Sequence, residues 1–240
     1  MNKRVELYRQ TDWILGDSME RILTSIENRR ITTGDQLFLL SGCSTGSGTT
    51  MCTIQMAIAF AEAGYRTLLV DCDSRKDSKY KRLCNEKEKG LSHFLLEDLE
   101  FKEIAYSTII PNLTYIPIGG VKQNPIYLFR NSRIVKFLKE AKESYEIILL
   151  DFPSIRISPE ATLLFHLVDG IILIASLNET TEKELLYAKD QLISYQEKYY
   201  GLIVNKISLS DLKGQMRDYD YYKQPKMIHR YIMHLKKRKC

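Results

Sequence analysis

The sequence contains no long hydrophobic run. No stretch of about 18 consecutive apolar residues occurs, and a membrane-spanning helix needs roughly that length. The opening segment, Met1–Gln10, is charged and lacks the apolar stretch that a secretory signal carries. We therefore expect neither a membrane-spanning helix nor a secretory signal.

Cysteine spacings typical of zinc sites and disulfide frameworks are also missing. The chain has five cysteines, an odd number, and none of them forms a C-x-x-C pair. Zinc-binding and disulfide-rich domains usually show such paired spacings. Reduced thiols are the simpler interpretation, and the expected location of the protein is the cytoplasm.

A strong excess of either charge is likewise absent. The net charge is +5, and no nucleic-acid partner is expected. Much of the positive charge comes from the consecutive residues Lys236, Lys237, Arg238 and Lys239. Such a run is either a solvated tail or a contact surface for anionic lipid or an acidic partner.

Short apolar runs bounded by turn residues recur through the middle of the chain. They are rich in Leu, Ile and Val and do not alternate with polar residues, which predicts strands buried on both faces. The runs are Gln36–Leu40, Arg66–Val70, Leu113–Ile118, Ile147–Leu150, Ile171–Ala175 and Gly201–Val204. Helical patterns lie between several of them, at Thr50–Ala63, Ile134–Ser144 and Thr181–Lys198. This alternation predicts an α/β fold with a parallel sheet covered on both faces.

The ends of the chain differ from this middle part. Residues 1–30 have the pattern of one or two helices and no strand signal, and residues 208–240 have no strong apolar period. We predict an N-terminal helical segment over 1–30, the α/β domain over 31–207, and a mobile, basic tail with several tyrosines over 208–240.

A loop rich in glycine, serine and threonine follows the first predicted strand and opens a helix. It is Ser41–Thr50, with the sequence SGCSTGSGTT. Glycines allow a tight turn close to a ligand, and free N–H groups at a helix start attract phosphate. In a P-loop, Gly48 would be followed by lysine, where this chain has Thr49. By itself the pattern fits a phosphate loop and an ordinary strand-to-helix turn equally well.

Two later strands end in acids. Asp71 and Asp73 follow one strand, and Asp151 follows another. Open parallel sheets bind ligands at the carboxyl ends of their strands, and carboxylates two residues apart can approach a divalent ion or its waters. The alternative for Asp71 and Asp73 is a polar strand end that caps the next helix. The three segments together are more specific than any one of them.

In this order, the three segments resemble the cytoplasmic bacterial tyrosine kinases of the CpsD/CapB type, a branch of the MinD/ParA-like P-loop group. Further segments are similar to that family over roughly residues 12–222: Gly90-Leu91-Ser92, Gly119–Pro125, Asp169–Leu173 and Gly201–Lys206. The resemblance implies a P-loop NTPase fold, with a mostly parallel central sheet flanked by helices on both faces.

The resemblance also implies roles for individual residues. It assigns catalysis to Asp71, Asp73 and Asp151, and the binding of Mg²⁺ to Thr50, Asp73 and Asp151. The tail tyrosines matching the family's autophosphorylated cluster are Tyr219, Tyr221 and Tyr222. ATP is expected to contact Thr45, Gly46, Ser47, Gly48, Thr49, Thr50 and Met51, with Asn205 near the base.

The sequence departs from the family pattern at several of these places. Thr49 replaces a lysine that would neutralise phosphate charge, and losing one such contact costs about 10²–10³ in rate. Cations that could substitute for it are Arg75, Lys76 and Lys79. Asp17–Ile26 takes the place of the family's ring-forming segment, with Glu20 and Leu23 at its arginine positions. Glu160 stands where relatives tend to have Asp.

These observations lead to three expectations about function. The first is an ATP-dependent tyrosine autokinase of reduced catalytic rate, which regulates capsular or exopolysaccharide biosynthesis and export. The second is an inactive regulatory partner of a membrane polysaccharide co-polymerase or of an active kinase. The third is a ParA- or MinD-like ATPase. That group usually has a signature lysine early in the loop, and Ser44 at the matching position argues against this assignment. The expected partners are the membrane activator, which would recruit the chain to the inner membrane face, and further copies or related kinases.

Overall fold

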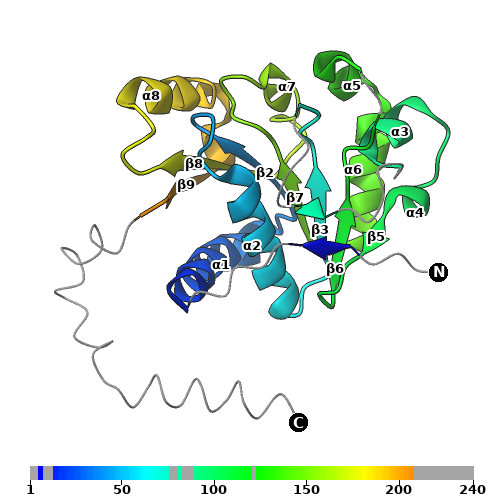
Figure 1. Ribbon diagram of the computed structural model, residues 1–240, viewed down its shortest axis with the longest axis horizontal. Coiled ribbons are helices and arrows are strands. Elements are labelled where there is room, and N and C mark those ends of the chain that lie inside the picture. Colours follow the sequence, from blue (N-terminus) through cyan, green and yellow to red (C-terminus); the bar gives the residue numbers. More distant parts are fainter. Residues whose placement is uncertain (1–4, 8–12, 76–80, 83–88, 121–122, 208–240) are drawn as a thin grey trace, which may run out of the picture. The chain divides into compact units, whose positions relative to one another are not determined.

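The computed structural model describes residues 5–7, 13–75, 81–82, 89–120 and 123–207. Its strands in the main sheet are β2 (Leu37–Gly42), β3 (Thr67–Asp71), β5 (Tyr106–Ser107), β6 (Leu113–Ile116), β7 (Ile147–Asp151), β8 (Gly170–Ser176) and β9 (Tyr199–Asn205). They form one seven-stranded sheet in the order β5-β6-β3-β7-β2-β8-β9 (Figure 1). Only β5 runs antiparallel to its neighbour, and the other pairs are parallel. The six predicted strands are present within two residues of their expected bounds.

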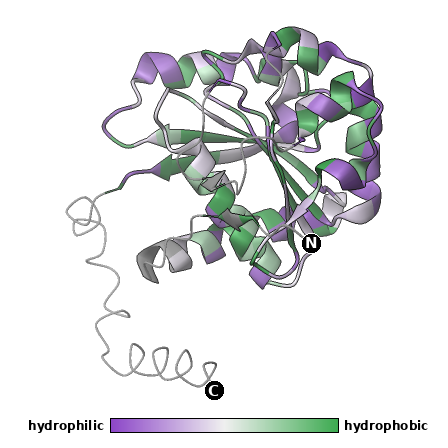
Figure 2. Cartoon of the chain, turned by 45° about the vertical axis from the view of Figure 1, so that its right-hand side comes forward, coloured by the Kyte–Doolittle hydropathy of each residue, from purple (hydrophilic) through white to green (hydrophobic). Residues whose placement is uncertain are grey.

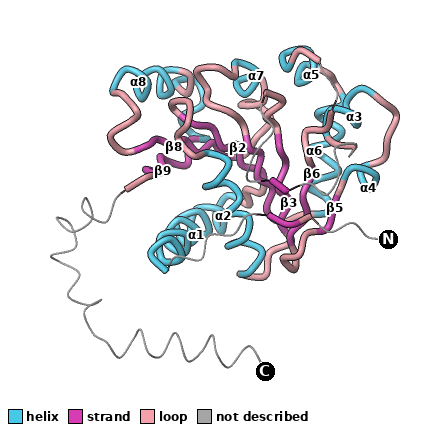
Figure 3. Tube along the Cα trace, viewed as in Figure 1, coloured by secondary structure: helices cyan, strands magenta, loops and turns pink. Residues whose placement is uncertain are grey.

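Helices cover both faces of this sheet (Figure 3). One face carries α1 (Trp13–Thr33) and α2 (Thr49–Glu62). The opposite face carries α3 (Leu91–Leu96), α4 (Phe101–Ile104), α5 (Pro125–Arg130), α6 (Arg133–Ser144), α7 (Pro159–Thr162), α8 (Glu182–Asp190) and the 3₁₀ turn Ile193–Lys198. The fold class expected from the sequence, a mostly parallel sheet flanked on both faces, is confirmed.

Alternate residues of each central strand enter two separate hydrophobic cores. Along β2, Leu37 and Leu39 face the α6 side, whereas Phe38 and Leu40 face α1 and α2. All four side chains are fully buried. Figure 2 shows the hydrophobic residues concentrated along the strands, between the helical layers. Because both faces of the strands are buried, their sequences are continuously apolar.

The N-terminal segment is not purely helical. Glu6–Leu7 forms a short strand, β1, that pairs antiparallel with β4 (Lys81–Arg82). The expectation of no strand within residues 1–30 is therefore wrong. Val5 and Leu7 are buried in the core beneath α1 and α2, so this short strand is stabilised by tertiary packing that leaves no local pattern in the sequence.

The helix expected over Thr181–Lys198 is interrupted. It starts with a capping box, in which the Thr181 hydroxyl accepts a hydrogen bond from the Glu184 N–H, but α8 ends at Asp190. The following 3₁₀ turn contains a non-helical residue, Tyr195, with φ −134°. The Tyr195 ring packs edge-on against Phe165, with their centroids 5.6 Å apart. The break accompanies this packing contact, which the helical pattern alone could not indicate.

Within the described residues, none of the helices has the length and apolar character needed to cross a bilayer. The α/β unit runs to Asn205, and of the segment after it only Lys206 and Ile207 are described. The predicted mobile tail over 208–240 lies outside the described residues.

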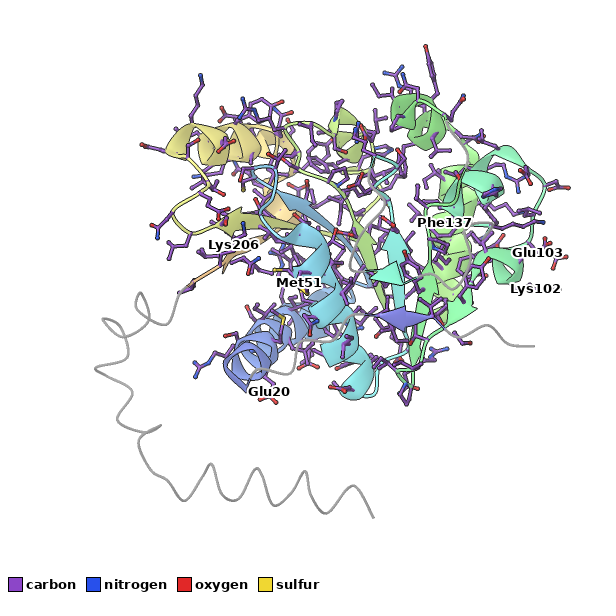
Figure 4. The ribbon with its side chains drawn as sticks, viewed as in Figure 1. Glu20, Met51, Lys102, Glu103, Phe137 and Lys206 are labelled. Carbon is purple, nitrogen blue, oxygen red and sulfur yellow. The ribbon has the colours of Figure 1, made fainter. Side chains whose placement is uncertain are left out.

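An aromatic cluster attaches α6 to the short helices next to it. Phe137 on α6, labelled in Figure 4, is fully buried. Its ring stacks on Phe101 at 5.4 Å and meets Phe94 edge-on at 5.6 Å. Val135, two residues earlier on the same helix, is 54% exposed.

We predict that Phe137→Ala lowers the free energy of unfolding by about 3–5 kcal/mol, because a buried aromatic ring is lost and a cavity remains. Val135→Ala on the same helix should change it by less than about 0.5 kcal/mol. Urea denaturation of both variants measures the difference. Similar losses for the two variants would contradict the assignment of Phe137 to the core.

Candidate functional site

The glycine-rich loop connects β2 to α2 and leaves a series of backbone N–H groups without protein acceptors. Gly46 and Gly48 both have φ 81°, in the left-handed region that glycine adopts without strain. Gly48 directly precedes α2. No backbone N–H from Thr45 to Met51 donates to a protein acceptor in the described part of the chain. These groups form the kind of concave N–H cluster that binds anions.

Hydrogen bonds from the far side hold this loop in place. The Ser47 hydroxyl donates to the carbonyl oxygen of Ser44 at 2.7 Å. The Ser44 and Thr180 hydroxyls lie 2.8 Å apart, which links the loop to the segment after β8. Asn205 Nδ2 donates to the Ser47 carbonyl at 2.9 Å. Sequence reasoning missed Thr180, since a single threonine after a strand carries no distinctive signal.

Asn205 therefore lies against the phosphate loop in this structure. A Cβ added to Gly48 would be only 2.3 Å from Asn205 Nδ2. The expected role of Asn205 near the base of a nucleotide stays a prediction. What the structure describes is a contact that supports the backbone of the loop.

Two of the three predicted acids are neighbours across the sheet. Asp71 at the end of β3 and Asp151 at the end of β7 are register partners in the parallel pair. Both are buried, with 5% and 1% of their surface exposed. The Thr53 hydroxyl on α2 lies 3.3 Å from Asp151 Oδ1, and the Tyr115 hydroxyl lies 3.4 Å from Asp71 Oδ2. The strand order brings together acids that are far apart in the sequence.

The third acid, Asp73, lies just beyond the strand and is half-buried. Its backbone N–H donates to Asp71 Oδ1 at 3.0 Å. Its own carboxylate Oδ1 accepts from the backbone N–H of Arg75 at 2.9 Å. Asp73 is thus connected to Asp71 on one side and to Arg75 on the other, and it is the more accessible of the two carboxylates.

Thr49 occupies the lysine position and packs inside the loop. Its surface is 9% exposed, and a Cβ added to Gly42 would lie 2.7 Å from Thr49 Oγ1. Thr50 and Met51, in the first turn of α2, are half-buried, and Met51 is labelled in Figure 4. The position that would supply a positive charge to a phosphate instead holds a small neutral side chain.

Arg75 does not take the place of the missing lysine in this structure. Its guanidinium forms an ion pair with Glu160, a residue with no exposed surface. Lys76 and Lys79, the other cations considered, lie outside the described residues, as do Tyr219, Tyr221 and Tyr222.

The thiols around the site are uncharged at neutral pH. Burial, together with the nearby charge of Asp151, raises the pKa of Cys52 to about 12. Burial, with a smaller effect of Glu184, raises the pKa of Cys43 to about 11. Neither cysteine adds a negative charge next to the loop or has the low pKa of a reactive thiol.

The segment Asp17–Ile26, which takes the place of the family's ring-forming segment, lies on α1. Met19 and Ile26 are buried against α2, whereas Glu20 is exposed (Figure 4). The exposed part of the segment thus presents Glu20 at one of the positions that hold arginine in the family. Whether this face joins copies of the chain stays a prediction.

The residues present fit a magnesium nucleotide. The free N–H groups of the loop suit phosphate, and the neighbouring acids suit the metal that accompanies it. Among the described residues, no group of three His, Cys, Asp or Glu side chains could hold a metal ion. A Mg²⁺ ion here would therefore depend on phosphate and water oxygens as well, which is its usual habit in nucleotide sites.

A parallel sheet, a phosphate loop after its central strand and acids at the ends of the adjacent strands define a P-loop protein of the nucleotide-binding class. An AAA domain model matches residues 41–175. The tyrosine-protein kinase CpsD of Streptococcus pneumoniae serotype 4 is 30% identical over 181 residues, which cover 74% of this chain and 79% of that protein.

Two further comparisons agree with this class. The tyrosine-protein kinase YwqD of Bacillus subtilis is 24% identical and covers 92% of both chains. The crystal structure of the kinase domain of Escherichia coli tyrosine kinase ETK aligns with a TM-score of 0.72 at 22% identity, over 78% of this chain and 73% of that one. The chain belongs to the bacterial tyrosine kinase family.

We predict that Gly48→Ala destabilises the protein more than Gly46→Ala. Both substitutions place alanine at φ 81°, which costs roughly 1–2 kcal/mol. Only Gly48→Ala also displaces Asn205 and breaks its bond to Ser47, at a further cost of about 1 kcal/mol. Chemical denaturation measures the two losses.

The control is the same pair of substitutions in an Asn205→Ala background. There the additional loss should disappear, and the two glycine variants should lose similar stability. A difference between them that persists without the Asn205 amide would contradict the described contact.

Proposed function

We propose that this chain binds ATP and Mg²⁺ at the phosphate loop and acts as a protein-tyrosine autokinase of strongly reduced rate. The observation that carries the proposal is the combination of an intact cluster of backbone N–H groups with a neutral residue at the lysine position. The N–H cluster runs from Thr45 to Met51. Asp71 and Asp151 are neighbours at the ends of adjacent strands, and Thr49 is buried inside the loop.

Nucleotide binding follows from the backbone, which the substitution at Thr49 leaves in place. The N–H groups at a loop and helix start provide a favourable site for phosphate. Mg²⁺ bound with the nucleotide would supply positive charge that neutralises part of the phosphate charge. Thr50, Asp73 and Asp151 would hold the ion or its waters, from α2, from the segment after β3 and from β7.

Reduced turnover follows from the missing cation. The family lysine would stabilise the charge that develops on the transferred phosphoryl group, and Thr49 cannot do so. Removal of one such donor costs about 10²–10³ in rate. Arg75 is held by Glu160, so it does not compensate in the described conformation.

Asp73 is the best candidate for the residue that receives the acceptor proton. The tyrosine hydroxyl oxygen would attack the γ-phosphorus of ATP, its proton would pass to a carboxylate, and ADP would leave. Asp73 is half-buried, whereas Asp71 is 5% exposed and faces the Tyr115 hydroxyl and the Asp73 N–H. We assign proton acceptance to Asp73 and its orientation to Asp71.

The target tyrosines under this proposal are Tyr219, Tyr221 and Tyr222. The process served is capsular or exopolysaccharide synthesis, and the partner is a membrane polysaccharide co-polymerase that recruits the chain to the inner membrane face. Assembly with further copies or with a related kinase belongs to the same proposal.

A second candidate, an inactive regulatory protein, is favoured by the same neutral Thr49. It would keep the fold and the nucleotide but transfer no phosphoryl group. A ParA- or MinD-like ATPase is less well supported, because Ser44 at the signature position bonds to Ser47 and Thr180 and carries no charge.

We predict that Thr49→Lys raises the affinity for ATP about 10- to 100-fold at constant Mg²⁺. One added hydrogen bond to a charged group contributes about 1.5–3 kcal/mol, which corresponds to that range. Isothermal titration calorimetry measures the change. Ser25→Lys, on the exposed face of α1, is the control for net charge and should have no effect.

We predict slow phosphotyrosine formation on the purified chain with ATP and Mg²⁺, with or without the activator fragment. Asp73→Asn should abolish it, and Thr49→Lys should accelerate it by about 10²–10³. Phosphotyrosine mapping by mass spectrometry gives the sites and rates. Complete absence of phosphotyrosine in all variants would favour the regulatory candidate, whereas rapid ATP hydrolysis that Asp151→Asn abolishes would contradict both.

A further inference from the structure

Glu160 is a carboxylate without exposed surface at the start of α7. Both of its oxygens accept hydrogen bonds from Arg75: one from Nη1, and the other from Nη2 at 3.0 Å. The two-pronged geometry matches the planar guanidinium to the carboxylate, which gives strong and directional pairing. This ion pair joins the segment after β3 to the segment after β7.

The pair continues into the acids of the site through the backbone. Arg75 uses its N–H to hold Asp73 Oδ1 at 2.9 Å, and Asp73 uses its N–H to hold Asp71 Oδ1 at 3.0 Å. Because the guanidinium and the N–H belong to one residue, Glu160 restrains the peptide that holds the Asp73 carboxylate.

The segment that carries Glu160 is itself fixed to the sheet. The Ile155 N–H donates to the carbonyl oxygen of Gly42 at 2.9 Å, and the Ser41 hydroxyl donates to the carbonyl oxygen of Pro153 at 2.7 Å. Ser41 and Gly42 are the last two residues of β2, where the phosphate loop begins. Glu160 is thus attached to the same strand end as the loop, and it can hold Asp73 in a fixed relation to it.

We propose that Arg75 and Glu160 are positioning residues that orient Asp73 for Mg²⁺ bound with the nucleotide. This inference rests on the proposed function, in which Asp73 acts at the metal. It assigns the ion pair a role beyond folding and explains why Arg75 is engaged rather than directed to the phosphates.

Electrostatics supports a charged pair at neutral pH. Burial by itself would raise the pKa of Glu160, but the hydrogen bonds from Arg75, with smaller effects of the Glu160 backbone N–H, of Ser158 and of the Arg75 charge, outweigh it and hold the pKa below its usual value. The hydrogen bond to Glu160 likewise raises the pKa of Arg75. Partners that orient a metal's own ligands typically change metal affinity or activity by about 10- to 100-fold when removed.

The test measures binding of ADP as a function of Mg²⁺ concentration, by calorimetry. Glu160→Gln should leave binding of ADP in EDTA unchanged and raise the Mg²⁺ concentration needed for half-maximal enhancement about tenfold. Arg156→Gln is the matched control. Arg156 pairs with Glu184 at 2.8 Å, but no described contact of that pair reaches Asp73. The Arg156→Gln variant should therefore need the same Mg²⁺ concentration as the unsubstituted chain.

A double variant, Arg75→Leu with Glu160→Leu, separates positioning from folding. Glu160 is fully buried and the Arg75 side chain is partly exposed. Replacing both by apolar residues avoids leaving the buried charge uncompensated and generally preserves stability. If the pair positions Asp73, this variant keeps its melting temperature but still requires more Mg²⁺. A normal Mg²⁺ requirement in the double variant would overturn the inference, even if Glu160→Gln does not fold.

Binding of ADP by the unsubstituted chain separates a failure of the proposed function from a failure of the positioning role. Failure of this chain to bind ADP at any Mg²⁺ concentration would overturn the proposed function and the inference with it. Normal binding by the unsubstituted chain, with unchanged Mg²⁺ dependence in both variants, would overturn the positioning role alone.

Discussion

The site depends on a short stretch of backbone, Thr45 to Met51, whose N–H groups donate to no acceptor among the described residues. A buried N–H without a partner costs about 1–3 kcal/mol, so a loop with several such groups needs water or an anion beside it. Thr45 and Gly46 are exposed, which gives solvent access. Contacts from Thr180 and Asn205 stabilise the loop from behind. The fold thus holds these groups in an open arrangement at the start of α2, where a helix leaves its first N–H groups unpaired.

The adjacent acids make the same site unsuitable for a bare anion. Asp71 and Asp151 end neighbouring strands and are both buried. The Tyr115 hydroxyl lies near the Asp71 carboxylate, and the Thr53 hydroxyl lies near that of Asp151. A divalent cation between the acids and a bound phosphate would satisfy both groups. The N–H cluster and the carboxylates are therefore complementary to a metal–phosphate pair rather than to either ion alone.

The strands were predictable because burial on both faces leaves continuous apolar runs, and the loop was predictable because its glycines stand at a strand-to-helix junction. The order of the strands was not, although it is the order that makes Asp71 and Asp151 register partners. The contacts of Thr180 and Asn205 with the loop were also hidden, since each joins residues more than a hundred positions apart. The break in the 181–198 helix had the same origin, because the packing of Tyr195 on Phe165 overrides a local pattern.

Because Thr49 replaces the lysine, other groups have to neutralise the charge of a bound phosphate. Thr49 has no charge, and the guanidinium of Arg75 satisfies the buried carboxylate of Glu160. Releasing Arg75 toward a phosphate would leave that carboxylate buried and unpaired, which typically costs 3–5 kcal/mol, more than the roughly 1.5–3 kcal/mol that one hydrogen bond to a charged group returns. This comparison favours the ion pair with Glu160 over release of Arg75 to a phosphate. In the proposed nucleotide complex, positive charge at the phosphates would then come mainly from Mg²⁺, and the proposed role of the ion pair is to orient an acid that would hold this ion.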